Sequence, residues 1–443
     1  MKIINVGLIG WGTVGTGVAK ILLNQEKFIR DHERLSLKLC KIADLDITTD
    51  RGVKIPKDIL TTNVNDVLKN PDIDIVVELI GGLKPASEFI FSALKEGKHV
   101  VTANKAVLAA HGKNLFQTAK ENKAMIKFEA SVGGCIPIIG SLLEGMAANN
   151  IHAIYGIVNG TCNYMLTQMA QRGIDFDTAL KEAQGKGYAE AKPDYDIEGI
   201  DAANKIVILT SLAYNTEIKL DDIYIEGITK ITQNDIQYAR EFGYQIKLLA
   251  IAKLMDDNKI QIRVHPTMIP KDTMLAGVEG VFNAIYVLGN ASGATMFYGR
   301  GAGQMPAASA VVGDIINVAK SIIAGTDHSL LPQPTLERTD YSLKPMDECL
   351  TRYYIRLQAL DKPGVLAKVT GILGNHDISI SSVIQKERKE GESVTVIMMT
   401  HEAIEKNAQS AIQQINDLDV ITEKAMMIRV ENMEGEEESL AIV

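Results

Sequence analysis

Three glycines near the N-terminus have the spacing of a turn that binds a dinucleotide. They belong to the segment Gly10-Trp11-Gly12-Thr13-Val14-Gly15. In such a turn the first glycine permits the bend, the second lets the pyrophosphate approach the backbone, and the third lets a helix pack against the preceding strand. The phosphates then lie at a helix N-terminus. A glycine turn without function is the alternative, but the position between an apolar run at 3–9 and a helical pattern at 14–23 favours a nicotinamide dinucleotide.

An acidic residue that follows the second predicted strand is a candidate for the adenosine ribose of this dinucleotide. Asp44 lies further from the turn than the usual spacing of about 20 residues, because a polar insert occupies 25–34. An ordinary turn aspartate is the alternative. Arg51 and Lys54 could instead bind a 2′-phosphate, so these residues leave NAD and NADP open.

Two lysines are candidates for proton chemistry. Lys105 follows a predicted strand that ends at Thr102, and ligands bind beyond the carboxyl ends of parallel strands. A surface lysine is the alternative there. Asp201 and Lys205 are four residues apart, on one face of a helix, where a solvated ion pair is the usual arrangement. The apolar residues at 206–209 favour a partly buried lysine, which would be a useful proton donor.

A glycine turn crowded with carboxylates lies just upstream of that helix, at 185–196. Glu190, Asp194 and Asp196 are its acidic residues. They could hold the ammonium group of a substrate, and an ordinary acidic loop is the alternative.

The elements that must position these groups follow from hydrophobic periodicity. Alternating strands and helices predict a parallel, doubly wound α/β sheet of the Rossmann type at the N-terminus. Its strands are expected at 3–9, 35–43, 73–79 and 99–102. A second, mixed α/β domain has helices over 163–212, strands over 250–288 and a final helix at 307–324. The last unit has the order βαββαβ, which is typical of a ferredoxin-like fold.

Composition excludes several classes of protein. The 443 residues are 46% hydrophobic and carry a formal net charge of −9 without a long basic run, which does not favour nucleic-acid binding. The four cysteines are scattered, so neither a disulfide framework nor a structural zinc site is expected. No signal peptide and no membrane span of about 20 apolar residues is apparent. We therefore expect a soluble, cytoplasmic protein.

Several long segments in one order resemble the homoserine dehydrogenase family, in its longer form with a C-terminal ACT domain. The resemblance covers nearly the whole chain. The segments that carry it are Gly7 to Gly15, Val100 to Lys105, Phe128 to Gly134, Ile157 to Tyr164, Gly187 to Ala191, Asp201 to Lys205, Gly299 to Gly303 and Leu360 to Leu366. The boundaries that we predict are 1–130 for the dinucleotide domain, 131–324 for the catalytic and dimerisation domain, 325–350 for a linker and 351–431 for the ACT domain.

The resemblance implies reversible, NAD(P)H-dependent reduction of L-aspartate 4-semialdehyde to L-homoserine, in threonine, methionine and isoleucine biosynthesis. It implies that Lys205 donates the proton to the carbonyl oxygen and that Lys105 lies beside it. The substrate-binding carboxylates implied are Glu190, Asp201 and Asp196. The cofactor-binding residues expected are Gly10, Trp11, Gly12, Thr13, Val14, Gly15, Asp44, Thr102, Lys105, Gly187 and Gly303.

The resemblance also implies a monovalent cation, commonly sodium, held mostly by backbone carbonyls. The residues at that turn are Glu129, Val132, Gly134 and Ile136. ACT domains pair edge to edge and bind amino acids at the junction, so we expect L-threonine as an effector and a homodimer or homotetramer. Asp361 is expected to cap a helix that has Pro363 in its first turn. The effector residues expected are Asp361, Gly364, Asn375 and Asp377.

Two positions depart from the family pattern. Ala43 stands where many members have arginine, which slightly favours NAD or the use of both cofactors, and Lys192 stands where aspartate is frequent. Two other functions remain as alternatives: a non-catalytic sensor of nucleotide and amino acid, and a dehydrogenase for another amino acid or hydroxy acid.

Overall fold

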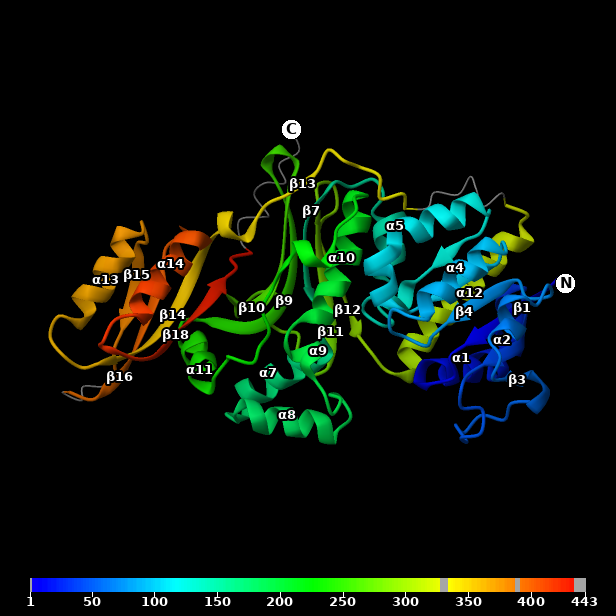
Figure 1. Ribbon diagram of the computed structural model, residues 1–443, viewed down its shortest axis with the longest axis horizontal. Helices are drawn as coiled ribbons and strands as arrows, with labels where there is room; N and C mark the ends of the chain where they lie inside the picture. Colours follow the sequence, from blue (N-terminus) through cyan, green and yellow to red (C-terminus); the bar gives the residue numbers. More distant parts are fainter. Residues whose placement is uncertain (1, 327–333, 387–390, 434–443) are drawn as a thin grey trace. The chain divides into compact units, whose positions relative to one another are not determined.

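The chain forms two compact units, each assembled from segments that are distant in sequence (Figure 1). The computed structural model describes residues 2–326, 334–386 and 391–433. The first unit comprises Met1–Ile151, Asn204–Asp222 and Phe282–Asp340, and the second comprises His152–Ala203, Ile223–Val281 and Tyr341–Val443. The predicted domain boundaries stay predictions, and residues 327–333 of the predicted linker lie outside the described residues.

A six-stranded parallel sheet forms the centre of the first unit. Its strands, in spatial order, are β3 (Leu60–Thr61), β2 (Ser36–Ala43), β1 (Ile3–Ile9), β4 (Ile75–Glu78), β5 (His99–Thr102) and β6 (Ile126–Lys127). All five pairings are parallel. This order is that of a doubly wound dinucleotide-binding sheet, in which the ligand binds where the order reverses, here between β1 and β4. The predicted Rossmann fold is therefore confirmed.

The helices of the first unit cover this sheet. They are α1 (Thr13–Asn24), α2 (Glu26–Glu33), α3 (Asn65–Leu68), α4 (Ala86–Lys95), α5 (Lys105–Glu121), α6 (Ile138–Gly140) and α12 (Gln304–Ile323). The polar insert after α1 is itself helical, as α2, and buries Ile29. An antiparallel hairpin of β11 (Phe282–Gly289) and β12 (Gly293–Arg300) leads into α12.

The helix α12 is long and apolar enough, by length and composition alone, to cross a membrane, which the sequence analysis did not anticipate. Its apolar side has another explanation in this unit. Val311, Ile315 and Val318 share one hydrophobic core with Val6 and Leu8 of β1. Burial against the sheet therefore accounts for the apolar composition of α12.

The second unit contains a mixed sheet that runs through two sequence regions. Its strands, in spatial order, are β7 (Ile151–Ile157), β9 (Tyr244–Met255), β10 (Lys259–Pro270), β18 (Ile421–Val430), β14 (Leu350–Leu360), β16 (Ser393–Thr400) and β15 (Ile380–Ile384). Three short strands join its members: β8 (Tyr224–Ile225), β13 (Ser342–Leu343) and β17 (Ala403–Ile404). The helices are α7 (Gly160–Arg172), α8 (Phe176–Gly185), α9 (Asp194–Ile197), α11 (Gln233–Glu241), α13 (Val365–Asn375) and α14 (Glu405–Asn416). The helix α10 (Ile200–Tyr214) begins in the second unit and continues into the first.

The C-terminal part of this unit has the predicted ferredoxin-like order βαββαβ, made by β14, α13, β15, β16, α14 and β18. The prediction that Asp361 caps α13 is wrong. The residue before α13 is Gly364, at φ 88°, and no side chain caps the helix there. The backbone of Asp361 is instead paired with Gly391 and Glu392, at 3.1 and 2.8 Å, which fixes it before the turn.

Buried charges join the ferredoxin-like part to the rest of the second unit. Strand β18 pairs in parallel with β10. On β18, Arg429 donates to Glu405 of α14 at 2.9 Å and to Glu226 at 2.8 Å. Arg263 of β10 donates to Glu431 at 2.5 Å. Burial alone would raise the pKa of Glu405, but the hydrogen bonds and charge of Arg429 hold that pKa below its usual value. The two sheet regions are therefore one hydrogen-bonded and ion-paired body.

We expect Arg429→Met to lower the free energy of unfolding by about 3–5 kcal/mol, because the change leaves the buried Glu405 carboxylate and the partly buried Glu226 carboxylate without their shared cation. Urea denaturation of the full chain measures this loss. The control is Arg30→Met, which breaks an exposed pair with Glu26 and should cost less than about 1 kcal/mol. Equal losses in the two variants would show that the ion pairs of Arg429 stabilise the fold no more than an exposed ion pair does.

Candidate functional site

The glycine turn has the geometry that a bound pyrophosphate requires. Gly10 has φ 98°, and a side chain there would lie 2.7 Å from the Leu79 carbonyl carbon. A Cβ atom on Gly15 would lie 2.1 Å from the Gly10 oxygen, so only glycine lets α1 start this close to β1. A Cβ atom on Gly12 would meet nothing within 4 Å, and no side chain caps α1 at this residue. The open space and the uncapped helix N-terminus fit an anionic diphosphate.

The acidic residue after β2 lies directly at this turn. Asp44 accepts hydrogen bonds from the backbone nitrogen of Trp11 at 2.5 Å and from that of Asp46 at 2.8 Å. The Arg51 guanidinium stacks on the Trp11 ring, 4.6 Å from its centroid, and pairs with Asp46 at 3.1 Å. Both an acid for a ribose and a cation for a 2′-phosphate thus stand at the adenosine side of the turn.

The carboxyl end of β5 leads straight into α5, where Lys105 is the first helical residue. Thr102 is fully buried, and its Oγ1 atom accepts a hydrogen bond from the Asn104 nitrogen at 3.0 Å. The Asn104 side chain caps α5 by accepting from the Val107 nitrogen at 3.2 Å. Lys105 is only partly exposed. It is therefore placed beyond the carboxyl end of a central parallel strand, as predicted from the sequence.

The first turns of α10 carry the acid–lysine pair. Asp201 is 3% exposed and Lys205 is 9% exposed, so neither belongs to a solvated helix surface. The helix is continuous from Ile200 to Tyr214, and a spacing of four residues puts both side chains on one face. Of the two interpretations left open by the sequence, the structure favours the buried lysine.

A single asparagine, for which the sequence analysis assigned no role, gathers the carboxylates of the second unit. The Nδ2 atom of Asn159 donates to Asp196 and to Asp201, each at 2.8 Å, and its Oδ1 atom caps α7 by accepting from the Cys162 nitrogen. Thr161 donates to the Tyr188 carbonyl oxygen at 2.6 Å and lies 3.4 Å from Asp196. The only available signal was the position of Asn159 at the end of a strand, directly before a helix.

The other predicted residues lie at glycine-containing loops. Glu190 is exposed after α8, and its backbone carbonyl accepts from the Gln184 side chain at 3.1 Å. Gly187 and Gly303 both have positive φ, 74° and 126°. Gly303 precedes α12, whose first turn packs on α1: a Cβ atom on Gly17 would lie 2.8 Å from the Gln304 oxygen. The glycine before α12 thus lies beside the helix that begins at the dinucleotide turn.

The predicted cation turn follows β6. Gly133 and Gly134 are both left-handed, with φ 71° and 60°, and a Cβ atom on Gly134 would lie 2.6 Å from the Gly301 oxygen. The Glu129 carboxylate accepts from the Ile139 and Gly140 nitrogens, at 2.7 and 2.8 Å. Among the described residues no group of three or more His, Cys, Asp and Glu side chains could hold a metal ion. Carbonyl oxygens of this turn would be the donors, and such donors fit an alkali cation better than a transition metal.

Asp314 of α12 holds the first residue of that turn. Its Oδ2 atom accepts from the Glu129 backbone nitrogen at 2.8 Å. Burial raises the pKa of Asp314 to about 7 and also raises the pKa of Glu129.

The structure does not bring the four predicted effector residues together. Asp361 and Gly364 precede α13, whereas Asn375 ends this helix and Asp377 follows it. At 1.5 Å per residue, the two ends of α13 are about 16 Å apart. One amino acid cannot contact both ends within one chain.

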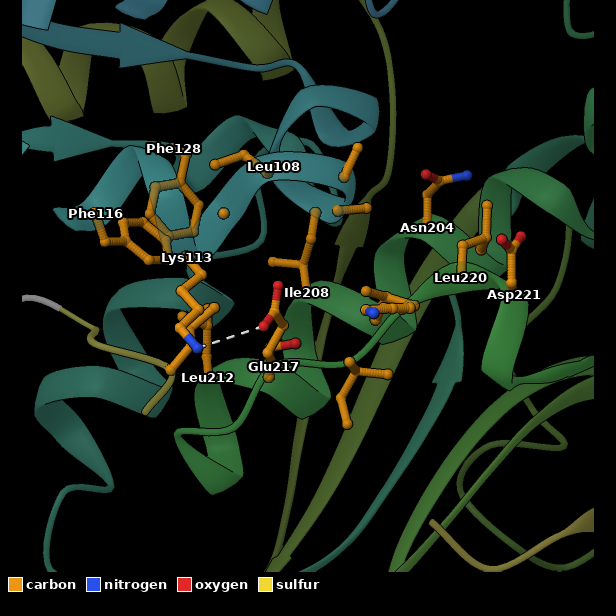
Figure 2. Close-up of a pocket in the computed structure, with 18 residues that line it drawn as sticks. Leu108, Lys113, Phe116, Phe128, Asn204, Ile208, Leu212, Glu217, Leu220 and Asp221 are labelled. Atoms are coloured by element: carbon orange, nitrogen blue, oxygen red, sulfur yellow. Dashed lines mark hydrogen bonds and ion pairs between the residues drawn. The ribbon is translucent and has the colours of Figure 1, made fainter. Parts of the chain in front are cut away.

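A cavity of about 330 Å³ lies between α5 and α10 in the first unit (Figure 2). Leu108 and Phe116 line it from α5, and an ion pair between Lys113 and Glu217 spans 3.5 Å at its side. Asn204 lines this cavity, but the next residue, Lys205, does not. Leu212, seven residues further along α10 and so on nearly the same side of the helix as Lys205, does line it.

The glycine turn opens at the switch point of a doubly wound sheet, and this defines the class of the protein as a dinucleotide-dependent oxidoreductase. Comparison with known proteins makes the class specific. A family model described as the NAD-binding domain of homoserine dehydrogenase matches residues 10–129, one for homoserine dehydrogenase matches 137–316, and one for the ACT domain matches 353–420. The chain belongs to the homoserine dehydrogenase family.

Individual relatives agree over the full length. Homoserine dehydrogenase of Neisseria gonorrhoeae is 41% identical over 436 residues, which cover 98% of this chain and 100% of the relative. The crystal structure of a homoserine dehydrogenase from Thiobacillus denitrificans has a TM-score of 0.91 at 44% identity, covering 98% of this chain and 99% of that one. A hyperthermophilic archaeal homoserine dehydrogenase in complex with NADPH has a TM-score of 0.61 at 28% identity, covering 72% of this chain and 98% of that one.

We expect Gly12→Val to abolish measurable dinucleotide binding while the protein stays folded, because the added side chain fills only the space that the pyrophosphate needs. Titration of reduced cofactor by fluorescence and a thermal melt measure the two properties. Gly313→Val is the matched control, since this glycine of α12 also has open space around its Cβ position. Unchanged cofactor affinity in folded Gly12→Val would contradict the assignment of the turn.

Proposed function

We propose that the chain catalyses the reversible reduction of L-aspartate 4-semialdehyde to L-homoserine, with NADH or NADPH as reductant, in the biosynthesis of threonine, methionine and isoleucine. The observation that carries this proposal is the burial of Lys205 one helical turn after the buried Asp201. A lysine that is largely removed from solvent is suited to donate a proton to a substrate oxygen. Family membership and the archaeal relative in complex with NADPH support the choice of substrate class and cofactor.

The dinucleotide is proposed to bind across the switch point of the sheet. The N–H groups at the start of α1 hold the pyrophosphate at Gly12 to Gly15, and Asp44 bonds the adenosine ribose. Arg51 can meet a 2′-phosphate, for which it would exchange its pairing with Asp46. Lys105 and the backbone at Thr102, at the carboxyl end of β5, would hold the nicotinamide end of the cofactor. When bound, the reduced nicotinamide would supply the hydride for the carbonyl carbon.

Lys205 supplies the proton that completes the reduction. Addition to the aldehyde carbon breaks the carbonyl π bond and leaves negative charge on the oxygen. The Lys205 ammonium group stabilises that charge and transfers its proton to the oxygen, which yields the hydroxyl group of the product. Lys105 adds a second positive charge at the nicotinamide side. In the reverse direction, neutral Lys205 removes the hydroxyl proton.

The carboxylates are proposed to orient the amino-acid end of the substrate. Asp196 and Asp201 share the Asn159 amide group, which holds two negative charges near one point. Together with Glu190 they can accept hydrogen bonds from the substrate ammonium group. A fixed ammonium group sets the distance from the aldehyde carbon to the nicotinamide, and such positioning supplies a large part of the rate enhancement in bimolecular reactions.

We also propose that a monovalent cation, sodium in the first instance, binds the carbonyl oxygens of Glu129, Val132, Gly134 and Ile136. The consecutive left-handed glycines and the close contact with Gly301 support this proposal. A cation there would neutralise the carbonyl dipoles that the turn brings together. We assign it a structural part and no step of the reaction.

Turnover with aspartate semialdehyde under each cofactor tests the proposed function directly. Oxidation of NADH and of NADPH is followed in parallel, and homoserine is compared with malate in the reverse direction. We expect turnover with homoserine and none with malate. Absence of turnover with both cofactors would remove the enzyme assignment, and preference for malate would point to another dehydrogenase.

We expect Lys205→Ala to lower kcat by about 10²–10⁴-fold while cofactor affinity persists, because general acid catalysis contributes a factor of this size. Steady-state kinetics and a cofactor titration measure the two effects. Lys113→Ala is the matched control, since this lysine makes a partly exposed ion pair on α5. A near-normal rate for Lys205→Ala would show that the lysine has only a structural part.

We propose that L-threonine, an end product of the pathway, inhibits through the ACT domain of a dimer or tetramer, and we expect millimolar L-threonine to lower the rate and raise the melting temperature. Ligand that binds only the folded state stabilises it by mass action. D-Threonine is the control. If L-threonine changes neither quantity, the ACT domain does not respond to this amino acid.

A further inference from the structure

A buried glutamate at the end of β4 has no part in the proposed chemistry. Glu78 is the last residue of β4, is completely buried, and lies beside Thr102 in the parallel pairing of β4 with β5. A buried carboxylate is costly unless its oxygens are hydrogen-bonded. Each of its oxygens accepts here: Oε2 from the Thr102 hydroxyl at 2.8 Å, and Oε1 from the Ile80 nitrogen at 2.9 Å and the Gly81 nitrogen at 3.3 Å.

These hydrogen bonds join the loop after β4 to the start of α5. Thr102 donates to Glu78 and accepts from the Asn104 nitrogen. Asn104 donates through Nδ2 to the Gly82 oxygen at 2.8 Å and accepts from the Val107 nitrogen in the first turn of α5. These hydrogen bonds therefore form a closed network in which Glu78 is the common acceptor. The network fixes the start of α5, whose first residue is Lys105.

The same loop contacts the dinucleotide turn. The nearest atoms to a Cβ built on Gly10 are the carbonyl group of Leu79 and the nitrogen of Ile80, at 2.7 to 2.8 Å. Beyond this contact, Gly81 and Gly82 have φ 73° and 70°, and Cβ atoms on them would meet nothing within 4 Å. The loop backbone is therefore held against Gly10 on one side and has open space on the other. Because it lies at the carboxyl end of a parallel strand, a ligand can approach it closely.

We propose that Glu78 is a positioning residue for the nicotinamide half of the cofactor: it holds the Ile80–Gly82 backbone where it faces the nicotinamide and its ribose, and through the buried Thr102 it fixes the start of α5 behind Lys105. The proposal deepens the proposed function and rests on it. Glu78 acts through other residues and does not itself reach substrate or cofactor. The adenosine half of the site, at Asp44 and the start of α1, does not depend on it.

The pattern of donors makes the carboxylate specific. The Thr102 hydroxyl and two backbone N–H groups all donate toward Glu78, so a side chain without hydrogens on its oxygens satisfies them together. In Glu78→Gln one oxygen is replaced by an NH₂ group, which cannot accept. If the NH₂ group faces the loop, the loop nitrogens lose their acceptor. If it faces Thr102, the hydroxyl must turn from donor to acceptor and its own hydrogen loses its partner, while side-chain volume is nearly unchanged.

The experiment compares binding of two probes to the full-length enzyme. ADP reports the adenosine and pyrophosphate half alone, and NADH reports both halves. In Glu78→Gln we expect ADP affinity close to wild type, weaker NADH binding, and a loss of about tenfold or more in kcat with aspartate semialdehyde, since small misplacement of reacting groups is costly. Thr102→Val should give the same selective loss, and Thr102→Ser should restore the behaviour of the wild type.

A double variant and a control decide between positioning and general damage. If the two groups act as one unit, Glu78→Gln combined with Thr102→Val should lose no more than the worse single variant. Glu88→Gln, at an exposed position of α4, is the control for removing a carboxylate near the sheet. Equal loss of ADP and NADH binding, or additive losses in the double variant, would overturn the proposal. So would wild-type kinetics in Glu78→Gln.

The test separates this inference from the proposed function. A wild-type protein that binds NADH but does not turn over aspartate semialdehyde would remove the proposed function. The ratio of NADH to ADP affinity in Glu78→Gln would still decide the positioning role. Turnover in the wild type with an unchanged ratio and rate in Glu78→Gln would remove the inference alone.

Discussion

The approach of α1 to its neighbours is the constraint on which the first unit depends. At Gly15 a Cβ atom would lie 2.1 Å from the Gly10 oxygen, and at Gly17 it would lie 2.8 Å from Ala308 of α12. The helix α1 therefore carries no side chain at the two positions where the backbone after β1 and the helix α12 approach it. The contact with β1 points the helix N-terminus at the switch point, and the contact with α12 brings a distant segment into the same core. The site for phosphates and the packing of the unit therefore have one cause.

Local pattern was enough to predict most elements. Strands at 3–9 and 99–102 match β1 and β5 residue for residue, and the βαββαβ order of the last unit follows from alternation and turn residues. Element bounds elsewhere differ by one to three residues: α1 is one residue longer at each end than expected, and α12 begins three residues earlier. The failures are also local in origin. A helix formed in the polar insert at Glu26–Glu33, and a left-handed glycine before α13 displaced the predicted cap.

Long-range pairing is what the sequence could not reveal. Asn159 bonds to Asp196 and Asp201, which lie 37 and 42 positions further along the chain, and Arg429 reaches Glu226 across 203 positions. Neither partner set has a spacing that periodicity detects. Resemblance supplied roles for the acids and lysines but none for Asn159 or Glu78. These two residues emerge only from the hydrogen bonds that converge on them.

The placement of the ACT domain changes how regulation must be understood. Strand β18 pairs with β10, and ion pairs cross the same junction. The ferredoxin-like part is therefore held to the rest of the second unit by strand pairing and ion pairs. Its other edge strand is β15. Because the two candidate effector regions lie at opposite ends of α13, a ligand that contacts both must be held by two chains. Regulation through these residues would then require the assembled form of the protein.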